Sequence, residues 1–322
     1  IVKIEHWVLI ALMVTAAFFL PYRYKIELTT MTQQENVVSR NNVLASCNSA
    51  IEAVDQNANE VFGTEAIRTT AIDEFYQTFN DCYNFHSEAA MESAKFYVPC
   101  LFLVDWDGYY VSYTQWYKDR DNATVYKDIV TSKNTWNKAY GKYMVQFRLD
   151  HFLTITTTDS NERYTGCFDE LYEKLGQPAE LSFMADQNAF DIEKTETIIS
   201  LINDQVSYYI NTQNAYFNKA SVQYTVVLPQ SDDDHTQELM DQPNVIAFMQ
   251  GKQKDNQGAY VNVYSFIAAD MTTEKKYYIE ADPSDGKLYY HEKDCPDVTD
   301  KKFLGTMLEC ARRKANPADC VK

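Results

Sequence analysis

The cysteines are the residues of this sequence most able to do covalent or metal chemistry. There are seven, and Cys295, Cys310 and Cys320 fall in a stretch of 26 residues near the end. A disulfide Cys295–Cys320 would hold a chain end that has little core of its own, so this pairing is favoured, with Cys310 left for a distant partner or unpaired. Cys82–Cys100 is a second candidate bridge. Because the total is odd, at least one thiol stays outside any disulfide within the chain.

The same tail also carries ligand types that suit zinc. His291 stands four residues before Cys295, and Cys310 and Cys320 follow. Zinc sites of this kind usually contain a Cys-x2-Cys pair, which is absent from the tail. The sequence therefore favours disulfides over a metal knot, and it predicts no metal ion and no cofactor.

The five histidines stand in no motif of a metalloprotease, a nucleophile elbow or a phosphate-binding loop. Cys100 or Cys167 with His151 would make a thiol–imidazole pair for nucleophilic catalysis, but no feature of the sequence brings these residues together. The sequence predicts no catalytic residue and no enzyme activity.

Two acidic clusters are candidates for calcium. Asp105 and Asp107 flank Trp106, and Asp232–Asp234 form a short acidic run. Neither contains the Asp-x-Asp-x-Asp-Gly loop with a distal glutamate that a dedicated calcium site uses. Asp105 and Asp107 are better explained by turn formation.

The composition excludes one class of partner. The chain has 322 residues and a net charge of -17, which disfavours nucleic acid because a binder needs basic side chains to replace phosphate counterions. Only 9 glycines are present, so glycine-rich phosphate-binding loops are not expected. The 24 tyrosines suit broad, partly solvent-exposed packing surfaces, because an apolar ring carries a polar hydroxyl.

The N-terminal segment is apolar and then amphipathic. Trp7–Leu20 is an uninterrupted apolar run, which with its flanks reaches the length of a membrane span, and Tyr22–Lys25 would form an interfacial belt. From residue 22 to 62 there is neither glycine nor proline, and apolar residues recur at helical spacing. We predict one helix over residues 1–62, kinked at Pro21 and ended by Gly63.

These N-terminal features resemble the type IV pilins and pseudopilins. In that family a leader peptidase exposes a new amino terminus, and an acidic fifth residue meets that amine in a neighbouring subunit. The resemblance implies that Ile1, Glu5 and Pro21 serve assembly, with Glu5 pairing with the Ile1 amine of another copy. The sequence departs from the family in having Ile1 in place of Phe or Met, a charged Lys3 and His6. Whether the N-terminus is processed or cropped stays open.

The rest of the chain is predicted to be an α+β head with an antiparallel sheet. A helix is expected over 64–95, a hairpin over 101–116 and a polar loop over 118–142. A further helix is expected over 191–217, and 245–250 is a short helix or strand. Further strands are predicted over 143–149, 152–157, 163–168, 221–228, 260–267, 275–280 and 287–291.

The fold class is therefore α+β: a long hydrophobic N-terminal helix serving as membrane span or filament core, an extracellular α/β head and a cysteine-containing tail. The predicted units are residues 1–62, of which 1–24 form the apolar segment, then 63–176, 177–290 and 291–322.

Four segments of the body, VPCLFLVDWDGYYVS, QYTVVLPQ, NVIAFMQG and KLYYHEKDCP, resemble a group of membrane-anchored proteins from tight-adherence pilus loci of Clostridia-like bacteria. This resemblance implies a role in a surface appendage and supplies no catalytic residue.

Two functions are expected from these observations. The first is a structural subunit of an extracellular type IV-like filament, assembled through its N-terminal helix from copies of itself. Its partners would be the membrane before assembly and the pilus assembly machinery. The alternative is a single-span, membrane-anchored extracytoplasmic binding or sensor module, which predicts a concave pocket with converging polar groups. Either one places the protein at the cell surface.

Overall fold

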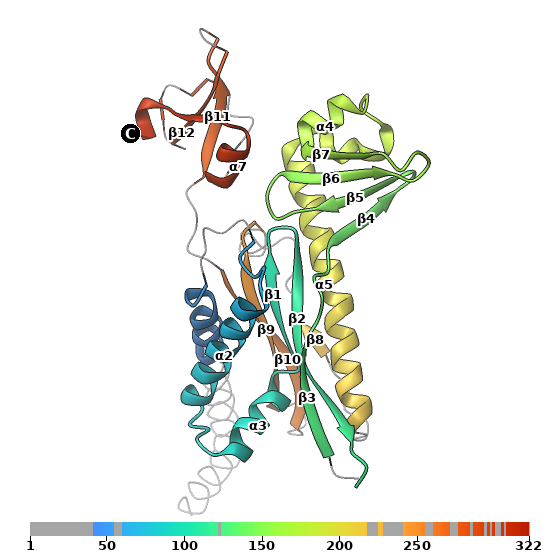
Figure 1. The fold of residues 1–322 in the computed structure, drawn as a ribbon, viewed down its shortest axis with the longest axis vertical. Coiled ribbons are helices and arrows are strands. Elements are labelled where there is room, and N and C mark those ends of the chain that lie inside the picture. The colour runs from blue at the N-terminus through green and yellow to red at the C-terminus, as the bar shows by residue number, and fades with distance from the viewer. Residues whose placement is uncertain are drawn as a thin grey trace, which may run out of the picture.

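A central sheet of six strands organises the molecule (Figure 1). The structure is a computed structural model, and it describes residues 41–54, 60–121, 124–217, 225–227, 241–254, 260–270, 276–283, 286–292, 295–296, 298–299, 304–305 and 307–321. The strand order is β3-β2-β1-β9-β10-β8, and only the β8–β10 pair is parallel. The strands are β1 (Cys100–Asp105), β2 (Gly108–Lys118), β3 (Thr124–Val130), β8 (Thr225–Val227), β9 (Asn244–Lys254) and β10 (Tyr260–Asp270).

Helices cover both sides of this sheet. Every residue of β1 is buried, which requires both faces of the strand to be covered. The helices α2 (Glu65–Cys82) and α3 (Glu88–Tyr97) lie on one side, and α5 (Gln187–Phe217) runs along the other (Figure 1). Tyr209 of α5 packs against Tyr113 of β2, with ring centroids 4.6 Å apart.

A second, four-stranded antiparallel sheet packs against the N-terminal half of α5. Its strands are β4 (Trp136–Tyr140), β5 (Tyr143–Phe147), β6 (Phe152–Thr157) and β7 (Arg163–Cys167), in sequence order. The helix α4 (Phe168–Lys174) and the 3-10 helix η1 (Ala179–Ala185) cover it. Phe168 stacks on Phe190 of α5 at 4.4 Å, so aromatic contacts form the core of this unit.

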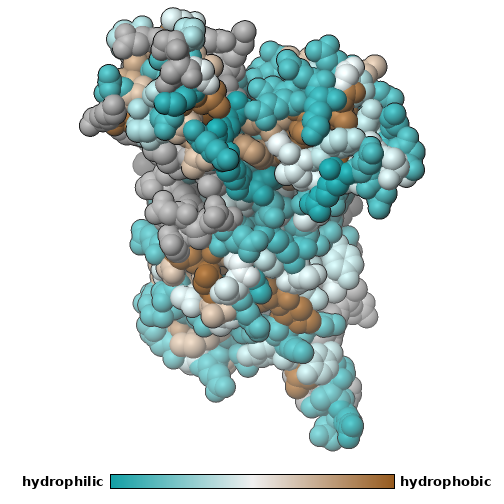
Figure 2. Space-filling model, turned by 45° about the horizontal axis from the view of Figure 1, so that its top comes forward, coloured by the Kyte–Doolittle hydropathy of each residue, from teal (hydrophilic) through white to brown (hydrophobic). Residues whose placement is uncertain are grey.

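The C-terminal unit is a third, small sheet. It contains β11 (Tyr277–Ala281), β12 (Leu288–Glu292), β13 (Leu304–Gly305) and β14 (Asn316–Pro317), in the order β13-β11-β12-β14. The helix α7 (Met307–Arg312) and the 3-10 helix η2 (Asp319–Val321) complete it. The unit stands at the same end of the molecule as the second sheet (Figure 1). The face in Figure 2 is mostly hydrophilic, with hydrophobic residues in separate small patches.

The prediction of one helix over residues 1–62 was wrong, and with it the predicted fold class. Residues 1–40 lie outside the described residues, and the helix that is described from residue 41 ends at residue 52. The Val61 amide donates to the Asp105 carboxylate at 3.1 Å, and Arg68 donates to the carbonyls of Phe62 and Gly63. The Val61 amide is therefore bound by the sheet and cannot donate within a helix that continues to residue 62.

The membrane element of that fold class was not found either. Among the described residues no helix is long and apolar enough to cross a membrane. The apolar run Trp7–Leu20 and the assembly residues Ile1, Glu5 and Pro21 lie outside the described residues. The head also differs from the prediction of a single antiparallel sheet, because three separate sheets are present in the described regions of the chain.

Two local predictions were also wrong. The helix expected over 64–95 is divided into α2 and α3, because Asn84 has a positive φ of 55° that no helix continues through. The loop expected over 118–142 contains β3 and β4. The start of this helix agrees with the expected residue 64, because Thr64 caps α2, its hydroxyl accepting from the Ile67 amide at 3.3 Å.

Candidate functional site

The candidate site begins at the end of β12 in the C-terminal unit. His291 is held in the centre of this sheet, where it pairs with Tyr278 of β11. The chain turns directly after β12, with the Cys295 amide donating to the Glu292 carbonyl at 2.9 Å. This turn returns the Cys295 thiol to the side of the His291 ring.

The third residue, Cys320, comes from the end of the chain. β14 pairs in parallel with β12, and the Ala318 amide then donates to the Tyr290 carbonyl at 3.1 Å. The turn of η2 follows directly and carries Cys320. The strand that holds His291 therefore also fixes the position of Cys320.

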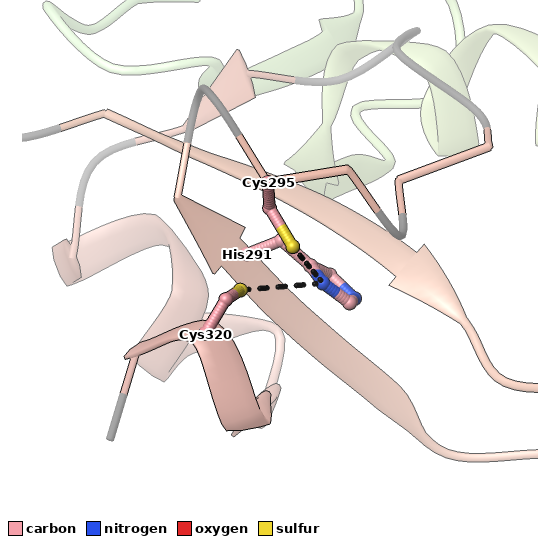
Figure 3. Close-up of side chains that lie close together, drawn as sticks. All are labelled: His291, Cys295 and Cys320. Carbon is pink, nitrogen blue, oxygen red and sulfur yellow. Dashed lines mark hydrogen bonds between the residues drawn. The ribbon is translucent and has the colours of Figure 1, made fainter.

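The three side chains point toward one another (Figure 3). The Nδ1 atom of His291 lies 3.6 Å from the sulfur of Cys295 and 3.7 Å from the sulfur of Cys320. One ligand atom from each residue lies within 4.8 Å of the other two, so the cluster has the dimensions of a metal site. Cys295 is buried, and His291 and Cys320 are half-buried.

A cavity of about 560 Å³ adjoins this cluster. His291 and Cys320 form part of its wall, whereas Cys295 does not. Its lining among the described residues includes the acidic residues Glu280, Asp282 and Asp319. The Glu280 carboxylate accepts hydrogen bonds from the amide and the hydroxyl of Thr299, and these bonds join two residues of the cavity wall.

The remaining predicted disulfide residues lie outside this cluster. All seven cysteines are thiols in the structure. Cys310 is fully buried in α7 and is not part of the His291 cluster. Cys82 ends α2 and Cys100 begins β1, where burial raises the pKa of the Cys100 thiol. The favoured pair, Cys295 and Cys320, is the one that the structure brings into the cluster.

His151 is not arranged to activate a thiol. Its Nδ1 lies 2.8 Å from Glu309 and its Nε2 lies 3.1 Å from Asp191, so carboxylates bind both ring nitrogens. Cys167 contacts Arg313 instead, and burial raises the pKa of its thiol despite that guanidinium. The thiol–imidazole pair considered from the sequence is not formed by Cys167.

Around His151 lies a buried charge network that the sequence did not indicate. Burial alone would lower the pKa of His151, but Glu309 and Asp191 raise it to about 9. Burial would raise the pKa of Asp191, but Lys194 and His151 lower it to about 2. His151 is therefore a cation at neutral pH, held between two carboxylates.

The network continues through Lys194, which is fully buried. Its ammonium donates to the Leu149 carbonyl at 2.8 Å and to Asp241 at 2.7 Å. Burial alone would lower the pKa of Lys194, but Asp241 and Asp191 raise it above its usual value. Lys276 binds the second oxygen of Asp241 at 2.8 Å, so each oxygen of this carboxylate contacts one lysine.

Two arginines of the C-terminal unit extend the same network. Arg312, the last residue of α7, contacts the buried Asp150, which also accepts from Arg148 at 3.0 Å. Arg313 follows directly and lies 3.2 Å from Asp169. The helix α7 is thereby joined to the second sheet by charged contacts, a coupling of residues far apart in the chain that no local spacing would show.

The calcium candidates have other partners. Asp105 accepts from the amides of Val61 and Trp106, and Lys133 binds both Asp105 and Asp107. The Lys133 ammonium thus lies between the two carboxylates, where a calcium ion would have to bind. Asp232–Asp234 lie outside the described residues.

Comparisons with models of known protein families, with curated proteins and with solved structures found no match to this chain. The function must therefore be inferred from the residues themselves.

Proposed function

We propose that this chain is a binding module whose ligand is cationic and enters the cavity of the C-terminal unit. The observation that carries the proposal is the cavity itself, which has about 560 Å³ and whose described lining includes the acidic residues Glu280, Asp282 and Asp319. Its volume is in the range of small-ligand sites, and its polar groups converge on one space.

Charge complementarity selects the ligand class. Acidic residues in the wall of a concave site favour a negative potential there, which attracts ammonium or guanidinium groups and disfavours carboxylates and phosphates. The net charge of -17 acts in the same direction over longer distances. A lysine- or arginine-bearing peptide or a small polyamine fits this chemistry.

The double variant Asp282→Asn/Asp319→Asn tests the proposal. We expect a blocked tri-lysine peptide to bind the wild-type chain and to bind the variant roughly 2- to 30-fold more weakly, because each partly exposed charge pair contributes about 0.2–1 kcal/mol. Isothermal titration calorimetry measures the affinity, and raising the salt concentration should weaken binding to the wild type.

The matched control is Asp73→Asn, which removes an exposed carboxylate of α2 away from the cavity. It should leave the affinity unchanged. Equal affinity of the wild type for tri-lysine and tri-glutamate peptides would contradict the proposal.

A second candidate function is a subunit of a type IV-like surface filament, with other copies of the chain and an assembly machinery as partners. Its support lies in the sequence, where Glu5 stands two residues before the apolar run Trp7–Leu20. A carboxylate in apolar surroundings costs about 2.5–3.5 kcal/mol, so it requires a partner such as the amine of a neighbouring copy.

The variant Glu5→Ala tests this candidate. We expect filament yield in the secreting host, counted by electron microscopy, to fall at least about tenfold, since each subunit would lose an interaction of the size given above. Glu52→Ala, which removes an exposed carboxylate, is the control. Undiminished filaments in the Glu5→Ala strain would exclude the role assigned to Glu5.

A further inference from the structure

We propose that His291, Cys295 and Cys320 bind a transition-metal ion, best satisfied by Zn²⁺, with a fourth coordination position that opens into the cavity. The proposal deepens the proposed binding function, because it places a metal ion at the wall of the cavity. It rests on the distances within the cluster, on the ligand types and on the way the three elements hold them.

The distances match a tetrahedral ion. Zn–S bonds near 2.3 Å and Zn–N bonds near 2.0–2.1 Å separate a sulfur from a nitrogen by about 3.6 Å at the tetrahedral angle. The two sulfur–nitrogen separations around His291 are 3.6 and 3.7 Å. Both sulfur–nitrogen separations therefore have the length that a shared tetrahedral ion requires, and the two sulfurs lie within 4.8 Å of each other.

Both sulfurs face the same Nδ1 atom of His291. A cation at the centre of the cluster would bind this nitrogen and both thiolates together.

The ligand set selects the metal. Two thiolates and one imidazole are borderline-soft donors, which suit zinc and disfavour calcium or magnesium. Two thiolates also neutralise the charge of a divalent ion, so the buried Cys295 can be accommodated as a thiolate beside it.

The fourth position follows from the cavity wall. His291 and Cys320 line the cavity, whereas Cys295 lies behind them and is only 5% exposed. An ion bound by all three residues would thus be shielded on the Cys295 side and open on the cavity side. An open position is typical of zinc sites that bind water or an incoming ligand.

Cobalt and zinc binding by the intact chain test the proposal. With its thiols reduced and metal removed, the wild type should take up Co²⁺ with a thiolate-to-cobalt charge-transfer band and the intense visible bands of a tetrahedral ion. Added imidazole should shift the visible bands by entering the open position. We expect Cys320→Ser and His291→Ala to lower Zn²⁺ affinity at least about 100-fold, since even the outer partners of metal ligands contribute 10- to 100-fold.

Cys82→Ser and His86→Gln are matched controls, because they change a thiol and an imidazole outside the cluster. They should bind both metals as the wild type does. Protection mapping needs no variant: Zn²⁺ should slow alkylation of Cys295 and Cys320 in the wild type but not of Cys82. This measurement decides the question if a ligand variant fails to fold.

Three outcomes would overturn the proposal. The first is that the fully reduced wild type takes up no metal. The second is that the control variants lose as much affinity as the ligand variants. The third is that imidazole leaves the cobalt spectrum unchanged, which would show that the ion has no open coordination position. Zinc binding without tri-lysine binding would support the metal site and contradict the proposed cationic ligand. Tri-lysine binding without zinc binding would support the cationic ligand and contradict the metal site.

Discussion

Replacing Lys194 by methionine is expected to destabilise the fold by about 3–5 kcal/mol, the cost of removing one partner from a buried ion pair. The ammonium of Lys194 is fully buried and binds Asp241, Asp191 and the Leu149 carbonyl. Methionine fills most of the same volume, so the loss is electrostatic rather than a cavity. Because whole domains are stable by only about 5–15 kcal/mol, the effect would be a large fraction of the total.

Urea unfolding followed by circular dichroism measures this loss. The matched control is Lys138→Met, since Lys138 binds Glu193 but its side chain is 43% exposed. A surface pair of this kind contributes up to about 1 kcal/mol, so the control should differ little from the wild type. Similar midpoints for the two variants would show that the burial of Lys194 has no energetic consequence.

A second substitution separates pairing from packing. Asp241→Asn in the Lys194→Met background removes the carboxylate that has lost the Lys194 ammonium and keeps its contact with Lys276. We expect the double variant to be about 1–3 kcal/mol more stable than the sum of the two single losses predicts. Strict additivity would mean that the two residues act independently.

Local patterns predicted the elements whose partners are close in sequence. The hairpin of β1 and β2 follows from the Asp-Trp-Asp-Gly turn between two apolar segments, and Asp105 indeed pairs with Gly108. The polar strand β3 was missed because it lies at the edge of its sheet, where Lys127 and Asp128 are tolerated in a strand. Propensity alone cannot reveal a strand that depends on its neighbour.

Long-range contacts limited the prediction of the ends of elements and of the site. The helix expected to reach residue 62 ends earlier because the Val61 amide is bound by Asp105, 44 positions further on. His291 and Cys295 were visible as a spaced pair, but the choice of Cys320 over Cys310 depends on the pairing of β14 with β12. No spacing in the sequence encodes that pairing.

The charge network makes stability depend on pH through His151. A histidine whose folded pKa is raised stabilises the fold below its unfolded pKa, and this stabilisation is lost as the pH rises through the folded value. The pKa of His151 is raised from 6.5 to about 9, chiefly because Glu309 and Asp191 outweigh the effect of burial. We therefore expect about 3 kcal/mol of stability to be lost between pH 6.5 and pH 9.

Comparing variants isolates the contribution of His151. Urea unfolding of His151→Gln should show a much flatter pH dependence over this range, because glutamine does not titrate. His86→Gln, which replaces an exposed histidine, should retain the wild-type slope. The acidic side differs in sign: the lowered pKa of Asp191 gives stability that is lost as the pH falls toward about 2. Parallel curves for the wild type and His151→Gln between pH 6.5 and pH 9 would refute the assignment.

The same titration should release the C-terminal unit before the rest of the fold. Glu309 belongs to α7, and its carboxylate binds both the amide and the ring of His151 in the second sheet. Loss of the imidazolium removes the positive charge that Glu309 contacts through His151, whereas Asp191 keeps Lys194, so the contact between α7 and His151 is weakened first. Amide hydrogen exchange above about pH 9, corrected for the intrinsic rate, should therefore rise in β11, β12 and α7 while β1 and β9 remain protected. His291 lies in β12, and Cys320 lies in η2 directly after β14, so bound zinc should raise the pH at which this release begins. A uniform rise in exchange over all three sheets would show that no such local opening occurs.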